Sequence, residues 1–92
     1  MSSEDTALME RGRALLKSGD VASARLLFQH LANAGIADAA LVLATTYDPQ
    51  YLAQHNVIGV AGDEAKARDW YQRASKLGSA EAGRILPRTA AD

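Results

Sequence analysis

The feature that most constrains the fold is an internal repeat. Residues 19–43 align without a gap on residues 62–86, and ten of the 25 aligned pairs are identical. The identical pairs are Gly19/Gly62, Asp20/Asp63, Ala22/Ala65, Ala24/Ala67, Arg25/Arg68, Gln29/Gln72, Gly35/Gly78, Ala37/Ala80, Ala39/Ala82 and Leu43/Leu86. Self-similarity at a fixed period is typical of architectures in which one small structural unit stacks on a copy of itself.

Each copy predicts a helix with both ends marked. Asp20 and Asp63 are suited to accept hydrogen bonds from the free amides of a first helical turn. Gly35 and Gly78 fall where the chain must turn left-handed to end the helix. We therefore predict B-type helices over about 20–34 and 63–77. Their apolar stripes have helical spacing and are Ala24, Leu27, Phe28 and Leu31 in one copy and Ala67, Trp70, Tyr71 and Ala74 in the other. Trp70 is expected to pack in the core.

Three further segments predict partner helices, which we call A-type. The first, at 3–18, has a single apolar stripe, as expected of an end helix. The second, at 38–47, is apolar almost all round, so it is expected between the two B-type helices. The third, at 79–86, is expected to be cut short by Pro87, with a frayed tail over 88–92.

Composition favours helices throughout. Hydrophobic residues make up 48% of the 92 residues, alanine supplies many of them, and aromatic residues are only 5%. Strands favour β-branched and aromatic residues, whereas alanine is the best helix former. We predict a single all-α domain over 1–92, with five main helices and a short helical insert.

One stretch of the chain resembles a known family. The stretch GVAGDEAKARDWYQRASKLGSAEA, residues 59–82, is similar to the Sel-like repeat, a relative of the tetratricopeptide repeat. The matching positions are Gly59, Val60, Asp63, Lys66, Ala67, Trp70, Tyr71, Ala74, Ser75, Gly78 and Ala82, and the first copy matches more loosely at Asp20, Ala24, Leu27, Phe28, Ala32, Gly35 and Ala39. The resemblance implies a short right-handed α-α solenoid of about two and a half helix-turn-helix repeats. Repeat one would cover about 7–38, repeat two about 39–81, and a terminal A-type helix 79–86. It also implies a non-catalytic scaffold that binds proteins, and the compact alanine-rich form suggests a bacterial source.

An insert interrupts the second repeat. Ala7 and Ala39 begin equivalent helices 32 residues apart, but Ala39 and Ala82 are 43 apart, so the extra residues lie within about 48–58. Pro49 disfavours helical backbone at Asp48, so the preceding helix should end near Tyr47. Asp48 and Pro49 then suit the start of a short helix near 49–55, closing at Asn56. The side chains expected to anchor the insert are Leu52, Val57, Ile58 and Val60.

Two interpretations of the insert stay open. In the first, the insert caps the end of an array too short to bury its own ends. Alternatively, Tyr47, Tyr51 and His55 offer a contact surface to a partner, since Tyr51 and His55 are four residues apart and share a helix face.

The resemblance implies a second candidate surface. In tetratricopeptide-type solenoids the A-type helices line the concave side, where basic residues take a peptide carboxylate. The matching outward positions are Arg13, Lys17 and Arg84, with Tyr47 between them. The expected partner is a protein or peptide. The alternative is a structural unit that caps or self-associates, with a second copy covering Ile85 and Leu86.

The residues argue against other classes of function. The two histidines, His30 and His55, belong to no ligand motif, there is no cysteine, and no glycine-rich phosphate loop occurs. We therefore expect no enzyme, no cofactor and no metal site. A net charge of -1 with scattered Lys and Arg speaks against nucleic acid. No stretch approaches the ~20 apolar residues of a membrane span, and the start lacks a signal peptide, so a cytoplasmic location is the default expectation.

Overall fold

The chain folds into helices joined by short turns and one longer connection. The computed structural model describes residues 1–90, with side chains as far as Pro87. The helices are α1 (Ser3–Ser18), α2 (Val21–Asn33), α3 (Ala37–Tyr47), α4 (Pro49–Gln54), α5 (Glu64–Lys76) and α6 (Ala80–Ala90). The described residues contain no strand, which confirms the all-helical prediction.

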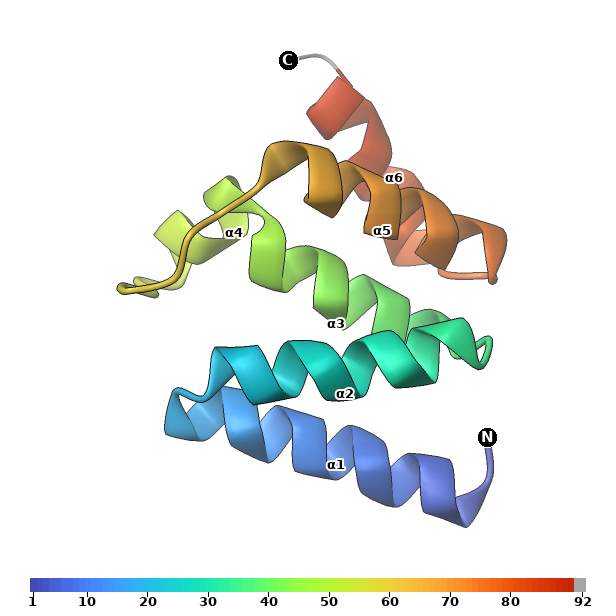
Figure 1. The fold of residues 1–92 in the computed structure, drawn as a ribbon. Helices are drawn as coiled ribbons and strands as arrows, with labels where there is room; N and C mark the ends of the chain where they lie inside the picture. The colour runs from blue at the N-terminus through green and yellow to red at the C-terminus, as the bar shows by residue number, and fades with distance from the viewer. Residues whose placement is uncertain (91–92) are drawn as a thin grey trace.

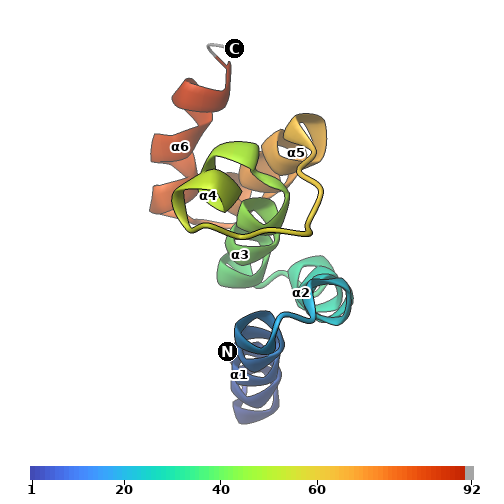
Figure 2. The ribbon, with the colours of Figure 1, turned by 90° about the vertical axis from the view of Figure 1, so that its left-hand side faces the viewer.

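The helices pack in chain order. The principal contacts run from α1 to α2, α2 to α3, α3 to α5 and α5 to α6, as Figure 1 shows. Seen end on, the A-type helices α1, α3 and α6 form one layer and the B-type helices α2 and α5 form the other (Figure 2). The Cα trace is only 16 Å across in its smallest dimension, which suits two helix layers at interaxial distances of about 8–10 Å.

Local hydrogen bonds fix the helix ends where the sequence predicts them. Oδ1 of Asp20 accepts from the Ser23 amide at 3.1 Å, and Oδ1 of Asp63 accepts from the Lys66 amide at 3.0 Å. At the other ends of α2 and α5, Gly35 and Gly78 have positive φ, which a residue without Cβ adopts at little cost. The predicted B-type helices are therefore confirmed to within one residue at each end.

Equivalent repeat positions meet in one core. Phe28 and its counterpart Tyr71 are 0% and 1% exposed, and the alanines around them are buried as well. Small residues allow the helices to approach closely: a Cβ added to Gly12 of α1 would lie 2.6 Å from Cζ of Phe28 in α2. The middle helix α3 is buried against both α2 and α5, as its all-round apolar sequence predicts.

Trp70 packs against the core, as predicted, but is not buried within it. It is only partly buried, and the Arg73 guanidinium lies 4.1 Å from its ring centroid. Successive residues of a helix point about 100° apart, and Trp70 and Tyr71 differ in burial as their repeat equivalents Leu27 and Phe28 do. The buried Tyr71 hydroxyl donates to a buried acceptor, Oδ2 of Asp48, at 2.7 Å.

The last helix is longer than predicted. It continues through Pro87 to Ala90 instead of stopping at Pro87. Proline removes one backbone donor and its ring crowds the carbonyl of Gly83 one turn earlier, but the helix continues past it. Fraying was expected over 88–92: residues 88–90 are helical, and 91 and 92 lie outside the described residues. Among the described helices, none is both long and apolar enough to cross a membrane.

Candidate functional site: a groove on the A-type face

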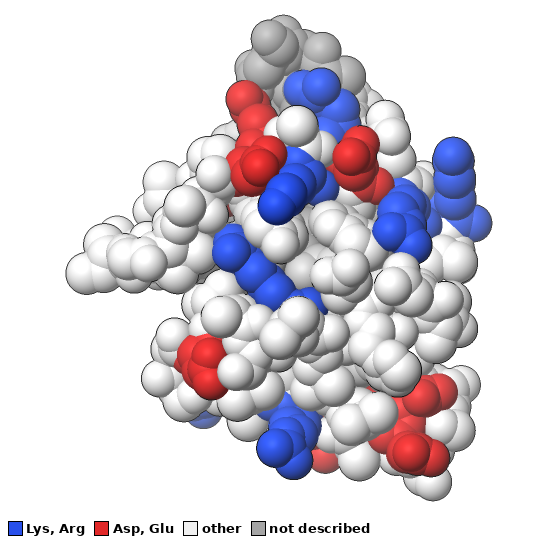
Figure 3. Space-filling view, viewed as in Figure 1, with Lys and Arg blue, Asp and Glu red and all other residues white. Residues whose placement is uncertain are grey.

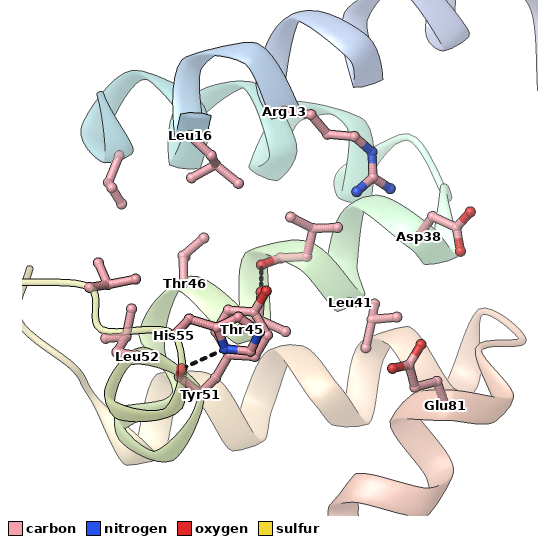
Figure 4. Close-up of a pocket in the computed structure, with 13 residues that line it drawn as sticks. Arg13, Leu16, Asp38, Leu41, Thr45, Thr46, Tyr51, Leu52, His55 and Glu81 are labelled. Atoms are coloured by element: carbon pink, nitrogen blue, oxygen red, sulfur yellow. Dashed lines mark hydrogen bonds between the residues drawn. The ribbon is translucent and has the colours of Figure 1, made fainter. Parts of the chain in front are cut away.

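A groove opens on the layer of A-type helices. Its volume is about 460 Å³, and it lies between α1 and α6 along the outer face of α3, with α4 beside one end (Figure 4). The lining residues come from every helix except α5 and are Arg13, Leu16, Val21, Asp38, Leu41, Val42, Thr45, Thr46, Tyr51, Leu52, His55, Val57 and Glu81. The groove is therefore built by segments that are far apart in the chain.

The floor is an apolar strip of α3. Leu41, Val42 and Thr45 occupy positions on one side of this helix that no other helix covers completely, since each is half-buried. The Thr45 hydroxyl donates to the Val42 carbonyl at 2.6 Å, so it is engaged within its own helix. The floor consequently offers apolar contact and few free polar groups.

The short helix α4 forms one end of the groove. The Asp48 carboxylate accepts from the Gln50 amide at 3.0 Å, and Pro49 takes the first helical position, as the sequence predicts. The Tyr51 and His55 rings stack with centroids 4.0 Å apart and planes at 19°. His55 Nδ1 lies 3.0 Å from the Tyr51 carbonyl oxygen; because a carbonyl can only accept, Nδ1 is the donor. These contacts hold both rings at the groove.

Long-range hydrogen bonds hold the insert in place. Tyr71 of α5 donates to Asp48, and the Asp63 amide donates to the Tyr47 carbonyl at 2.7 Å. Arg25 of α2 donates to the carbonyl oxygens of Thr46, at 2.6 Å, and Ala61, at 3.2 Å. These bonds tie the insert and the residues on either side of it to α2 and α5, and α4 (Pro49–Gln54) confirms the predicted short helix.

The predicted apolar anchors of the insert behave unequally. Leu52 is buried, and the Val57 amide donates to its carbonyl at 2.9 Å, closing the end of α4. Asn56 has the predicted left-handed backbone, with φ of 55°. Ile58, however, is 91% exposed, so its predicted anchoring role is wrong. The turn at Asn56 directs the chain away from the bundle, and the protruding loop is free of charged side chains at the left of Figure 3.

Charged side chains stand at the other end of the groove. Asp38 lies in the first turn of α3 and Glu81 in the first turn of α6, while Arg13 comes from α1 on the opposite wall (Figure 4). All three side chains are exposed. One end of the groove is therefore uncharged and aromatic, and the other carries two carboxylates and one guanidinium.

The structure brings together half of the predicted site residues. Arg13, Tyr51 and His55, predicted as parts of two separate surfaces, line the same groove. Lys17 and Arg84 are exposed on α1 and α6 but do not line it. Tyr47 faces another part of the molecule: the Arg25 guanidinium lies 3.9 Å and the Lys66 ammonium 5.4 Å from its ring centroid.

Sequence reasoning missed the two carboxylates and the α3 floor. Asp38 and Glu81 are equivalent in the repeat alignment, so acidic residues recur at one position of the A-type helices. Their place in the first turn already has an explanation in the helix dipole, which stabilises negative charge there. The recurrence of an acidic residue at this position is the signal from which the shared surface could have been predicted.

The opposite face of the molecule lacks the separation into a charged end and an uncharged end that the groove has. Figure 3 shows Lys, Arg, Asp and Glu intermixed over α5 on the B-type side. A shallower hollow there, about 310 Å³, is lined by α5 alone and contains Lys66, Asp69, Trp70, Gln72, Arg73 and Lys76. Within the part of the chain that the structure describes, no three His, Cys, Asp or Glu side chains gather as metal ligands.

Comparison with known proteins adds no relative: no family model matches the chain, and neither curated proteins nor solved structures give a match.

Proposed function

We propose that this protein is a small interaction scaffold that holds a segment of a partner protein in the groove between α1, α3 and α6. In this proposal the chain is a short right-handed solenoid of the Sel-like, tetratricopeptide-related type. The internal repeat and the alternation of A-type and B-type helices in two layers support it. The protein is proposed to be non-catalytic and to act without a cofactor.

One observation carries the proposal. Three A-type helices and the insert converge on a single groove, with an apolar floor, aromatic side chains at one end and charges at the other. Binding sites for peptides and small molecules are mostly apolar clefts with a few polar groups that fix orientation. A groove of about 460 Å³ is large enough for a few side chains of a partner.

The groove also joins the two interpretations of the insert. Leu52 and Asp48 bury themselves at the end of α3, which is the behaviour of a cap. Tyr51 of the same short helix and His55, which caps its end, remain partly or fully exposed beside the groove. We propose that α4 does both: its inner side closes the bundle and its outer side contacts the partner.

Affinity purification with matched variants tests the proposal. Arg13→Ala and Tyr51→Ala remove groove side chains, whereas Lys17→Ala removes an equal charge one turn away on α1, outside the lining. A partner held in the groove is expected to be retained by wild type and Lys17→Ala and lost or strongly reduced with Arg13→Ala and Tyr51→Ala. Equal recovery with all four proteins would place the interaction elsewhere.

Self-association is the second candidate. Helix α6 packs chiefly on α5, and its Ile85 and Leu86 are only half-buried although they pack against the core. A second copy would cover this apolar surface. Size-exclusion chromatography with light scattering decides: a mass that rises with concentration supports this candidate, and a constant monomer mass excludes it.

A further inference from the structure

The two ends of the groove differ in chemistry, and this difference restricts what the groove can hold. Thr45, Leu52 and the aromatic pair Tyr51 and His55 surround one end, and the whole segment 49–62 contains no Lys, Arg, Asp or Glu. The lining charges all lie toward the other end, where Asp38, Glu81 and Arg13 stand (Figure 4). A bound segment must therefore match an apolar end and a charged end in a fixed direction.

The charged end is acidic on balance. Asp38 and Glu81 contribute two negative charges from neighbouring helices, and Arg13 contributes one positive charge from the opposite wall. Both carboxylates sit in the first turn of a helix. A cationic side chain placed between α3 and α6 would face two carboxylates, while Arg13 can donate to a backbone carbonyl of the same segment.

The length of the floor sets a spacing. Asp38 and Thr45 are seven residues apart on α3, which corresponds to about 10 Å at 1.5 Å per helical residue. An extended chain advances about 3.3 Å per residue, so the same length spans about three residues of a bound segment.

We propose that the groove selects a segment in which a Lys or Arg lies about three residues from a large apolar side chain. The apolar side chain packs beside Tyr51 and His55, and the basic side chain lies between Asp38 and Glu81. This inference rests on the proposed function and names the chemistry of its partner. A peptide rich in acidic residues is disfavoured, because it would bring like charges together at the open end.

A random peptide library tests this inference. The probe is an immobilised set of nine-residue peptides in which Lys plus Arg and Asp plus Glu are equally frequent, incubated with the purified full chain. Bound peptides are expected to be enriched in Lys or Arg with an apolar residue about three positions away. In the double variant Asp38→Lys/Glu81→Lys, affinity for the selected peptides is expected to fall about five- to tenfold, and a new selection should favour Asp or Glu.

Arg84→Glu is the matched control, because Arg84 is exposed on α6 three residues from Glu81 but does not line the groove. It should leave the wild-type preference unchanged, and circular dichroism should show equal helix content in all variants. Wild-type selection of acidic peptides, or of peptides without charge preference, would overturn the inference and leave the proposed function standing. Absence of any bound peptide would overturn both.

Discussion

The Tyr71 hydroxyl donates a 2.7 Å hydrogen bond to Oδ2 of Asp48, and both side chains are buried. The same carboxylate accepts from the Gln50 amide through Oδ1. One residue thus starts the insert helix and joins it to α5, across 23 residues of chain. The position of the groove end formed by α4 depends on this contact.

Removing the hydroxyl should weaken the whole fold. Tyr71→Phe keeps the ring in the core but takes one donor from a buried carboxylate, which is expected to cost about 1–3 kcal/mol in the free energy of unfolding. Urea denaturation followed by circular dichroism measures this. Tyr51→Phe, at a partly exposed tyrosine, is the control and should change stability by no more than about 0.5 kcal/mol. Equal stability of Tyr71→Phe and wild type would contradict the role given to this bond.

The surroundings of two helical glycines, Gly12 of α1 and Gly83 of α6, predict opposite effects of substitution by alanine. A Cβ at Gly12 would meet the Phe28 ring at 2.6–2.8 Å, so Gly12→Ala is expected to lose about 1–2 kcal/mol despite its better helix propensity. A Cβ at Gly83 would meet nothing closer than Ser75 Oγ at 3.7 Å, so Gly83→Ala should gain up to about 1 kcal/mol. Thermal unfolding of the two variants gives the comparison. A Gly12→Ala variant more stable than Gly83→Ala would contradict the close packing of α1 against α2 at Gly12.

Arg25 is expected to keep the insert and the residues that follow it in a fixed conformation. Its guanidinium donates to Thr46 and to the Ala61 carbonyl while it covers the Tyr47 ring. Arg25→Lys cannot reproduce this planar set of donors. Hydrogen–deuterium exchange should therefore become faster in residues 55–63, with a smaller effect on α1.

Arg73→Ala is the control for this experiment. Arg73 also covers an aromatic ring and donates to Asn33, but it lies on α5 away from the insert. It should leave exchange in residues 55–63 unchanged. Faster exchange in that segment with both variants would mean that the effect is global and does not come from the Arg25 contacts.

Asp20 provides a prediction on pH. Hydrogen bonds from the Ser23 hydroxyl and then from the Ser23 amide lower the pKa of Asp20 from its ordinary value of 3.8. A lowered pKa means that the ionised cap stabilises the folded state above pH 3.8 and that this contribution disappears as the pH falls through the folded-state pKa. Carboxyl NMR titration should give an Asp20 midpoint below 3.8, and Ser23→Ala should move it upward. Ser18→Ala, whose hydroxyl bonds to Leu15 instead, should not. A native midpoint at or above 3.8 would refute the capping interaction.

The sequence by itself determined the helices and most of their limits, with the end of α6 beyond Pro87 as the exception. Asp20, Asp63 and Asp48 each bond to an amide two or three residues later, and Gly35 and Gly78 turn the chain by their own backbone freedom. These interactions are local, so a short stretch of sequence contains everything needed to predict them. The repeat alignment likewise indicated which equivalent residues, such as Phe28 and Tyr71, fill the core.

Only the tertiary structure decided how the surfaces combine. Gly19 and Gly62 are aligned in the repeat, yet Gly19 has a positive φ, whereas a Cβ at Gly62 would lie 2.9 Å from Pro49 Cγ. The acceptor of the buried Tyr71 hydroxyl is Asp48, which comes from the insert and has no counterpart in the repeat alignment. The groove likewise joins Arg13, Tyr51 and Glu81, whose separation in the chain gives no hint of their proximity. Such contacts depend on how whole helices stack, and local propensity carries no information about the stacking.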